Sequence, residues 1–300
     1  MRFRGMLLAV AAALLVTACA TTTAPPPAPP TPPVATPTPR PAPKIGLALG
    51  GGAAKGFAHI GVIKVLEAQG IVPDIVVGTS AGSVVGAMYA AGKNGFELQE
   101  LAMQMEKREV IDWSVFGKGW IKGEALQQFI NKAVGGRPLE KLGKPFGAVA
   151  TDLGSGEPIL FRVGDTGMAV RASASVPGIF QPVTISGREY VDGGLVSPVP
   201  ARYARAMGAD LVIAVDISDK PQGQKTGGVV DVLLQTVNIM GHTISQHELP
   251  QADIVIRPAI GQLSSTSLET QQLAVLEGEK AAARVIPELK AKLAKLREQR

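Results

Sequence analysis

One serine of the chain stands in a pattern typical of a catalytic nucleophile. Gly78-Thr79-Ser80-Ala81-Gly82 is a GxSxG sequence, and it lies between an apolar run typical of a strand and a small apolar stretch typical of a helix. In a nucleophile elbow, the tight turn from strand to helix exposes the serine hydroxyl, and the flanking glycines make room for the turn and the substrate. The amino terminus of the helix also stabilises negative charge that develops during attack. The pattern therefore predicts Ser80 as a nucleophile that attacks a carbonyl carbon.

A serine hydroxyl needs an adjacent base to take its proton, so the chain must supply a partner for Ser80. Of the three histidines, His59 falls near the start of a predicted helix, where a packing role is favoured. His242 and His247 belong to an apolar stretch with the spacing of a helix, not to a short loop after a strand. The chain order Ser80, Asp192, His242 fits the triad of the α/β-hydrolases, so a histidine-dependent esterase stays open as an alternative.

Asp192 has a setting that favours a role as the base. Tyr190-Val191-Asp192-Gly193-Gly194 places a carboxylate at the end of a short apolar strand. Gly193 and Gly194 would let another backbone segment approach the carboxylate closely. Asp-Gly is also an ordinary turn signal, so this segment alone does not separate a base from a turn.

The elements that must position these residues start with two strand, turn and helix units. Residues 45–49 are expected to form a buried strand, followed by a glycine turn and an amphipathic helix over 55–68. Residues 75–77 are expected to form a second strand and residues 80–91 a helix packed closely on the sheet. Two such units in a row indicate parallel strands with right-handed crossovers.

The rest of the chain continues this alternation. Further strands are expected over 146–151, 158–163, 211–217 and 253–257. Further helices are expected over 97–107 and 123–134, as a possible cap, over 166–174, and over 229–244 as a buried helix. A last helix is expected over 269–298, interrupted at Pro287. The predicted fold class is α/β, a three-layer α/β/α sandwich with a mostly parallel central sheet and a carboxyl-terminal helix.

Five sequence blocks occur in order within about residues 44 to 217. They are Gly50-Gly51-Gly52-Ala53-Ala54-Lys55-Gly56, Ala58-His59-Ile60-Gly61-Val62, the GxSxG sequence, Ala174-Ser175-Val176-Pro177-Gly178-Ile179-Phe180-Gln181-Pro182, and Asp192-Gly193-Gly194. In this order the chain resembles the patatin-like phospholipase family. The resemblance implies hydrolysis of lipid acyl esters by a Ser-Asp dyad without histidine. It implies Ser80 as nucleophile, Asp192 as proton acceptor, and the backbone amides of Gly50, Gly51 and Gly52 as the oxyanion hole.

The glycine loop departs from the usual family sequence at two positions. Ala53 stands where the family often has glycine, and its Cβ excludes some positive-φ conformations. Lys55 stands where the family often has arginine, so the positive charge is kept but the planar fork is lost. A supporting role, without a chemical step, is assigned to Lys55, Gly56, Gly78, Gly82, Gly193 and Gly194.

The sequence indicates neither a cofactor nor a metal. The loop over 50–56 lacks the GK[ST] ending of a P-loop and the middle glycine of a dinucleotide fingerprint. Cysteine, histidine and carboxylate residues do not cluster at metal-ligand spacing. A cofactor-free hydrolysis is therefore expected.

Composition and charge are those of one α/β domain that does not bind nucleic acid. The chain has 300 residues, 46% of them hydrophobic, with 35 glycines and a formal net charge of +5. Its basic residues are spread along the chain, without the dense runs or interleaved aromatic residues of a nucleic-acid groove. No nucleic-acid partner is expected, and no particular protein partner is indicated.

The amino terminus resembles a bacterial lipoprotein signal. Two arginines precede an apolar run over 6–16, which has the length of a signal-peptide core. Val16-Thr17-Ala18-Cys19 then resembles a lipobox, which predicts removal of residues 1–18 and attachment of lipid to Cys19. Cys19 is the single cysteine of the chain, so an intrachain disulfide is excluded.

A tether is expected to follow the lipidated cysteine. Residues 25–43 contain 11 prolines, a composition that favours an extended polyproline II conformation. At about 3.1 Å per residue, this tether would reach roughly 60 Å. The expected division is a tether over 19–43, a patatin-like catalytic domain over 44–217, and residues 218–300 completing the same domain. Because Ala20 differs from the aspartate retention signal of inner-membrane lipoproteins, the outer membrane of a bacterial envelope is favoured.

Taken together, these residues predict a serine acyl hydrolase. Its expected substrates are (lyso)phospholipids or related lipids, and its expected partner is the membrane surface reached through the lipid anchor. An alternative of another class is a non-catalytic envelope lipoprotein that binds lipid. The presence of both Ser80 and Asp192 disfavours that alternative.

Overall fold

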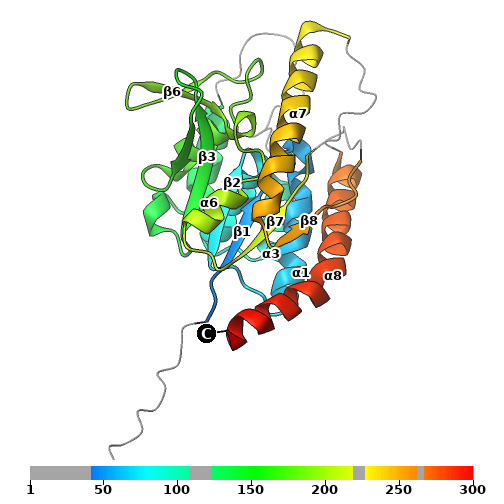
Figure 1. Ribbon diagram of the computed structural model, residues 1–300. Helices are drawn as coiled ribbons and strands as arrows, with labels where there is room; N and C mark the ends of the chain where they lie inside the picture. Colours follow the sequence, from blue (N-terminus) through cyan, green and yellow to red (C-terminus); the bar gives the residue numbers. More distant parts are fainter. Residues whose placement is uncertain (1–41, 108–122, 219–226, 262–266, 300) are drawn as a thin grey trace, which may run out of the picture. The chain divides into compact units, whose positions relative to one another are not determined.

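A mostly parallel sheet forms the centre of the molecule in the computed structural model, which describes residues 42–107, 123–218, 227–261 and 267–299 (Figure 1). The strand order is β5-β6-β3-β2-β1-β7-β8, and β4 pairs with β3 outside this order. Strands β1, β2, β3, β7 and β8 are parallel, whereas β4 and β6 run antiparallel to β3. The strands are β1 (Ile45–Leu49), β2 (Ile75–Thr79), β3 (Phe146–Asp152), β4 (Pro158–Phe161), β5 (Val183–Ile185), β6 (Arg188–Asp192), β7 (Leu211–Val215) and β8 (Ile254–Ile256).

Helices cover both faces of this sheet. They are α1 (Phe57–Ala68), α2 (Ala81–Ala90), α3 (Gly95–Lys107), α4 (Glu124–Ala133), α5 (Thr166–Ser173), α6 (Ala201–Ala206), α7 (Val229–Glu248) and α8 (Leu268–Glu298). Successive residues of β1 point to opposite faces of the sheet. Leu47 therefore packs in the core that includes α1, α2 and α8, whereas Ala48 packs in the core that includes α6. The predicted three-layer α/β/α class is confirmed.

The central strands are buried along their whole length because both of their faces are covered. Every residue of β1, β2, β3 and β7 is buried. These mostly apolar runs contain no pattern typical of a helix or a turn. The strand bounds predicted from the sequence therefore agree with the structure within one or two residues.

The carboxyl-terminal helix packs directly on the first helix. A Cβ atom added at Gly61 of α1 would lie 2.0 Å from the Val275 carbonyl oxygen, and one added at Gly278 of α8 would lie 2.1 Å from the Ala58 carbonyl oxygen. Only glycine permits this contact. The two helices run in the same direction, since Ala58 lies beside Gly278 and Gln69 accepts a hydrogen bond from Lys290.

The predicted interruption at Pro287 is wrong. Helix α8 continues through Pro287 to Glu298, and it only changes direction along its length (Figure 1). Proline removes one backbone hydrogen bond, but it bends a helix without ending it when the flanking turns are held by packing. Here Ile286 and Leu289 are both buried in the main core.

The prediction of a buried helix over 229–244 is correct for the helix and wrong for the burial. Among the described side chains of α7 that precede Gly241, none is buried, and Val229 is 87% exposed. Among the described residues of α7, buried ones occur only from Gly241 onward, such as Ser245 and Glu248. Apolar spacing reports a helical face, but burial also requires a neighbouring element to cover that face.

The predicted helices over 97–107 and 123–134 are present as α3 and α4. Lys64 of α1 donates to Gln99 of α3 at 3.1 Å, and the Gly167 amide of α5 donates to Asn131 of α4 at 2.7 Å. These helices therefore pack on α1 and α5, and their role as a cap stays a prediction.

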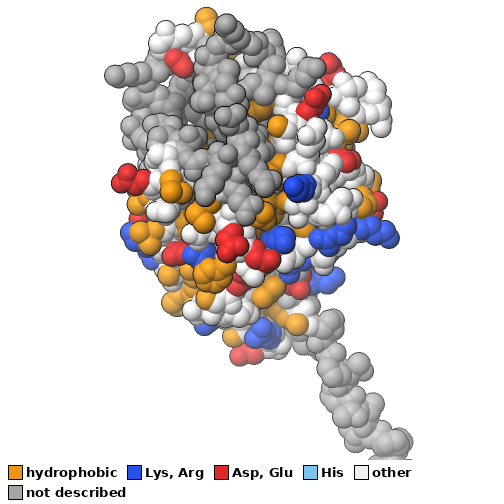
Figure 2. Space-filling model, turned by 180° about the vertical axis from the view of Figure 1, so that it is seen from behind, with side chains coloured by type: hydrophobic (Ala, Val, Ile, Leu, Met, Phe, Trp, Pro, Cys, Tyr) orange, Lys and Arg blue, Asp and Glu red, His pale blue; other side chains and the backbone are white. Residues whose placement is uncertain are grey.

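The predicted signal peptide, Cys19 and most of the tether lie outside the described residues. Residues Pro41–Arg300 form one compact unit, and within its described part no helix combines the length and apolarity needed to cross a bilayer. On the face shown in Figure 2, acidic and basic side chains of the described part are interspersed among apolar ones.

Candidate active site

Ser80 occupies the sharp turn between β2 and α2. Its φ of 53° and ψ of −123° lie in a region that side-chain-bearing residues rarely adopt. A Cβ atom added at Gly78 would lie 2.3 Å from the Gly82 carbonyl oxygen, and one added at Gly82 would lie 2.0 Å from the Leu49 carbonyl oxygen. Only glycine fits at either position. The predicted strand, turn and helix around the serine are confirmed.

The sheet brings Asp192 to this turn. Strand β6 pairs with β3 so that Asp192 lies opposite Ala150, and β2 pairs with β3 so that Thr79 lies opposite Val149. The ends of β2 and β6 therefore meet at the carboxyl end of β3. There the Ser80 hydroxyl donates a 2.6 Å hydrogen bond to Asp192 Oδ2, across 112 positions of sequence.

Two glycines hold the Asp192 carboxylate in place. The Gly194 amide donates to Asp192 Oδ1 at 2.7 Å. A Cβ atom added at Gly193 would lie 2.2 Å from the Val149 carbonyl oxygen, so this glycine lets the turn lie directly on β3. Burial raises the pKa of the Asp192 carboxyl to about 6, and the hydrogen bonds from Ser80 and Gly194 oppose that rise. The carboxyl is thus poised to exchange a proton near neutral pH.

The glycine loop lies against Ser80, but two of the loop amides already donate hydrogen bonds. A Cβ atom added at Gly51 would lie 3.2 Å from the Cβ of the serine. The Gly50 amide donates to the Val215 carbonyl at 3.0 Å, and the Gly51 amide donates to the Pro198 carbonyl at 2.9 Å. Within the described residues, the Gly52 amide has no such acceptor. Of the three amides predicted as oxyanion donors, Gly52 alone could serve without an exchange of hydrogen bonds, and the role of the loop stays a prediction.

The remainder of the loop forms a short helical turn. Ala53 has a φ of 50°, so it adopts the left-handed conformation that its Cβ was expected to disfavour. Lys55 is buried, and its amide donates to the Gly52 carbonyl at 3.1 Å. A Cβ atom added at Gly56 would lie 3.0 Å from the Ala81 Cβ, so the loop packs closely on the start of α2.

His59 holds the loop, which is more than the packing role expected from the sequence. Its Nε2 lies 2.8 Å from the Gly50 carbonyl oxygen. Burial lowers the pKa of His59 to about 4, so the ring is neutral at pH 7. Because a carbonyl oxygen only accepts, Nε2 carries the hydrogen and donates it.

Ser173 was missed by sequence reasoning. Its hydroxyl oxygen accepts the Ser80 backbone N–H at 3.0 Å and donates to the Val149 carbonyl at 2.6 Å. The segment that follows contributes through its backbone, because the Ser175 carbonyl accepts the Asp192 amide at 2.9 Å. A serine on a helix that faces the sheet has no sequence signal, although Ser173 directly precedes the family block that begins at Ala174.

A buried carboxylate network was also missed. The Thr79 hydroxyl donates to the Ser197 carbonyl at 2.8 Å, and the Ser197 hydroxyl donates to Glu248 at 2.5 Å. The Val199 amide donates to the other Glu248 oxygen at 3.3 Å. Burial raises the pKa of Glu248. Between Ser197 and Val199 lies Pro198, which accepts the amide of the glycine loop, so Glu248 anchors a segment that contacts both the loop and the elbow.

The two remaining histidines are not brought to the Ser80–Asp192 hydrogen bond. His242 Nε2 lies 3.0 Å from Gln246 Nε2 on the same helix, and His247 is exposed. In the described part of the chain, the hydroxyl of Ser80 hydrogen-bonds a carboxylate and no imidazole.

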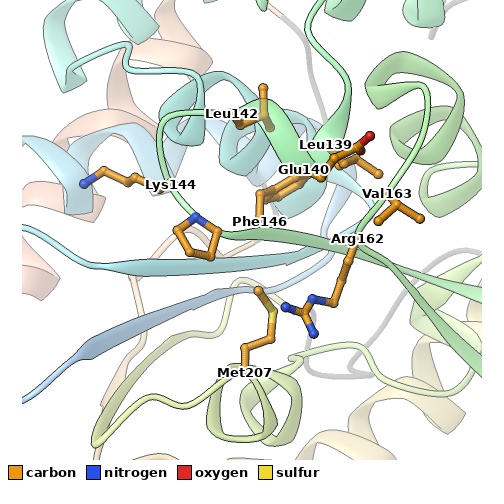
Figure 3. Close-up of a pocket in the computed structure, with 9 residues that line it drawn as sticks. Leu139, Glu140, Leu142, Lys144, Phe146, Arg162, Val163 and Met207 are labelled. Carbon is orange, nitrogen blue, oxygen red and sulfur yellow. The ribbon is translucent and has the colours of Figure 1, made fainter.

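A cavity of about 410 Å³ lies at the opposite edge of the sheet, where β3 begins (Figure 3). It is lined by Leu139, Glu140, Leu142, Lys144, Pro145, Phe146, Arg162, Val163 and Met207. In Figure 3 the Lys144 side chain points away from the other lining side chains, and its Nζ donates to the Pro73 carbonyl at 2.9 Å. The lining contains neither Ser80 nor Asp192, so this cavity is separate from their site. Among the described residues, no group of three His, Cys, Asp or Glu side chains could hold a metal ion.

Comparison with known protein families identifies the family of the chain. The family described as patatin-like phospholipase matches residues 47–205, which is more than half of the chain. The chain belongs to the patatin-like phospholipase family. The match spans the glycine loop, the elbow and the Asp192 turn, so the resemblance drawn from the motifs is confirmed.

Several relatives of this patatin-like chain carry NTE names. An uncharacterized NTE family protein of Mycobacterium tuberculosis is 34% identical over 207 residues, which are 68% of this chain and 57% of the relative. Patatin-like phospholipase domain-containing protein 6 of Homo sapiens is 33% identical over 186 residues, which are 59% of this chain and 14% of that protein. Lysophospholipase nte1 of Aspergillus oryzae is 32% identical over 189 residues, which are 60% of this chain and 12% of that protein. The chain thus spans less than two thirds of the length of these relatives.

A solved structure shares the patatin-like fold. VipD from Legionella pneumophila aligns with a TM-score of 0.51 at 16% identity, over 83% of this chain and 67% of VipD. At this identity the comparison supports the fold alone.

Proposed function

We propose that this patatin-like chain is a serine acyl hydrolase that cleaves ester-linked fatty acids of lysophospholipids, phospholipids or related lipids. The observation that carries the proposal is the 2.6 Å hydrogen bond from the Ser80 hydroxyl to Asp192, in a strained turn at the amino terminus of a helix. Family membership and the names phospholipase and lysophospholipase among the relatives support it.

The reaction would proceed by two acyl transfers. Ser80 Oγ attacks the ester carbonyl carbon while Asp192 takes the hydroxyl proton, and the carbonyl electron pair moves onto its oxygen. The oxyanion then collapses, the bond to the alcohol breaks, and Asp192 returns the proton to the leaving alkoxide. In the second step Asp192 takes a proton from water, and the resulting hydroxide attacks the carbonyl carbon of the acyl-serine. The bond from this carbon to Ser80 Oγ then breaks, Asp192 returns the proton to Oγ, and the fatty acid leaves.

Two features of the site suit this chemistry. A base works best when its pKa lies near the working pH, and burial raises the pKa of Asp192 to about 6. The developing oxyanion would be stabilised by the Gly52 amide and by the amino terminus of α2, which begins directly after Ser80. Loss of one oxyanion donor typically costs about 10²-fold to 10³-fold in turnover.

The test is hydrolysis of a short-chain p-nitrophenyl ester and of a lysophosphatidylcholine. Ser80→Ala and Asp192→Asn should each lose at least about 10³-fold in turnover. The double variant His242→Ala, His247→Ala is the matched control and should keep full activity. Loss in the histidine variant, with the fold intact, would favour a histidine-dependent esterase. Absence of turnover by the unaltered chain would favour a lipid-binding lipoprotein.

We also propose that the chain is a lipoprotein anchored through Cys19 in the bacterial outer membrane. Support comes from the lipobox sequence, the absence of any other cysteine, and Ala20 after the cysteine. Labelling with radioactive palmitate should mark the chain, and Cys19→Ser should abolish the label. Ala20→Asp should shift the labelled protein to the inner-membrane fraction. An unlabelled chain in the soluble fraction would refute the anchor.

A further inference from the structure

Helix α7 exposes an apolar stripe on one of its faces. Spacings of three and four residues place the stripe on one side of the helix, with Thr236 and Thr243 in the same row. Between residues 232 and 247 the helix contains no Asp, Glu, Lys or Arg. The α7 stripe consists of Val229, Val232, Leu233, Ile239 and Met240, each between 38% and 87% exposed. Surface helices normally turn charged residues outward, so this face is unusual for contact with water.

The α7 stripe adjoins the Ser-Asp site. A Cβ atom added at Gly241 would lie 3.8 Å from the Gly194 carbonyl oxygen, so the middle of α7 is level with the turn after Asp192. A Cβ atom added at Gly178 would touch Leu233 at 2.7 Å. At 1.5 Å per residue, the part of α7 that precedes Gly241 is about 18 Å long. In Figure 1 this part stands past the carboxyl ends of the central strands, which is the edge that carries Ser80.

More exposed apolar residues lie at the same edge of the sheet. Leu268, Leu273 and Leu276, at the start of α8, are 43% to 46% exposed. Helix α8 runs in the same direction as α1, with Gly278 against Ala58 near the first turn of α1. The residues of α8 that precede Gly278 therefore lie at or beyond the amino-terminal end of α1. That end of α1 follows the glycine loop, so the three leucines lie on the same side of the sheet as Ser80.

We propose that the α7 stripe docks the domain on the surface of a lipid bilayer, with the Ser80 edge of the sheet toward the lipid. This inference rests on the proposed function, because a lipid ester resides in the bilayer and the site must approach it there. Fluid lipid covers an apolar helix without a complementary shape or ion pairs, which agrees with the nearly uncharged stripe.

The path of the amino terminus adds a reason for a separate docking surface. Strand β1 begins at Ile45, and parallel strands begin at the sheet edge opposite Ser80. A tether attached before Ile45 would hold the domain near a membrane without turning Ser80 toward it. The α7 stripe lies at the sheet edge that carries Ser80, so contact between the stripe and lipid would turn Ser80 toward the membrane.

The test compares vesicle binding of two matched double variants. Val232→Gln with Ile239→Gln replaces side chains that are 53% and 49% exposed in the α7 stripe. Val72→Gln with Val163→Gln replaces side chains that are 50% and 70% exposed, next to the opposite sheet edge. All chains lack residues 1–19 and carry Ser80→Ala, so neither an anchor nor hydrolysis interferes. This truncation removes none of the compact unit, which starts at Pro41.

Flotation with phosphatidylcholine vesicles gives the result. The stripe variant should partition into vesicles about tenfold less than its parent, because apolar area is no longer buried in lipid, and the control variant should match the parent. Added salt should leave binding unchanged, since the stripe carries no charge. Equal partitioning of the two variants, or no binding by the parent, would overturn the proposal. The proposal would also be overturned if the parent were a dimer in sedimentation and the stripe variant a monomer with unchanged vesicle binding. In that case a second copy of the chain, and not lipid, would cover α7.

The same substitutions with Ser80 intact separate docking from chemistry. The stripe variant should hydrolyse a soluble short-chain ester at the parental rate, which also reports its folding, and should hydrolyse vesicle lipid about tenfold more slowly. If the parent binds vesicles through the stripe and hydrolyses no ester, the proposed function fails and the docking surface stands. If ester hydrolysis is intact and vesicle binding ignores the stripe, the docking surface fails and the proposed function stands.

Discussion

Replacing Asp192 by asparagine is expected to stop catalysis and to stabilise the fold at neutral pH. Asparagine has nearly the shape of aspartate. Its Oδ1 can accept the Gly194 amide, which now donates at 2.7 Å, and its Nδ2 can donate to the Ser80 hydroxyl, which now lies 2.6 Å from Oδ2. Both hydrogen bonds are kept, while the buried charge and the capacity to take a proton are lost.

The size of the effect follows from the burial of the carboxylate. Burial raises the pKa of Asp192 from 3.8 to about 6, and two pKa units correspond to about 3 kcal/mol. The folded state holds the proton more tightly than the unfolded state. The contribution of Asp192 to the free energy of unfolding therefore falls as pH rises from about 4 to about 6, and it stays low above that range. Asparagine does not titrate, so the stability of the variant relative to the unaltered chain should rise by about 3 kcal/mol between pH 4 and pH 7.

Urea denaturation followed by circular dichroism, at several pH values from 4 to 7, measures this difference. Ser80→Ala is the matched control, because it is equally inactive but keeps the carboxylate and removes a hydrogen bond that favours it. Relative to the unaltered chain, that control should gain no stability as pH rises. If Asp192→Asn is no more stable relative to the unaltered chain at pH 7 than at pH 4, the carboxylate is not desolvated as its burial indicates, and the reasoning fails.

Three further outcomes are expected. Hydrolysis of a short-chain ester should rise about tenfold from pH 5 to pH 7, because the pKa of Asp192 lies at about 6 and only the carboxylate accepts a proton; a flat profile would contradict its role as base. Gly78→Ala should lower the free energy of unfolding by more than about 3 kcal/mol in urea titrations, since its Cβ would lie 2.3 Å from the Gly82 carbonyl oxygen, and a change within experimental error would show that the turn relaxes. Glu248→Ala should lower kcat about tenfold with KM little changed, because it loosens the segment that accepts the glycine-loop amide, and Glu248→Gln should recover part of the loss. A rise in KM alone would contradict that positioning role.

Local patterns were sufficient for the central strands and for the strand, turn and helix around Ser80. Strands β1, β2, β3 and β7 are buried on both faces, so their apolar runs carry no competing signal. The turn at Ser80 depends on glycines two residues away on each side, which is a local requirement visible in the sequence. Asp192 was different, because an Asp-Gly pair alone predicts only a turn. Its partnership with Ser80 was inferred from the order of the family blocks.

The supports of the site could not be predicted, because their partners are distant in sequence and carry no local pattern. Ser173 meets the Ser80 amide across 93 positions, and Glu248 meets Ser197 across 51 positions. His59 was expected to pack a helix, and only the folded loop shows that the Gly50 carbonyl lies within hydrogen-bonding distance of its ring. Each of these contacts depends on which loops the sheet order places side by side.

By itself, the sequence determined the α/β class, the positions of the central strands, the nucleophile elbow, and the family whose motifs name Ser80 and Asp192. These features follow from periodicity and from glycine at positions where a Cβ would collide with nearby backbone, and both are written in short segments. Only the tertiary structure decided which amides of the glycine loop are already engaged, that α8 continues through Pro287, and that α7 leaves its apolar face uncovered. The physical reason is that hydrogen-bond partners and burial are properties of neighbouring elements, and the neighbours of an element are set by the packing of the whole chain.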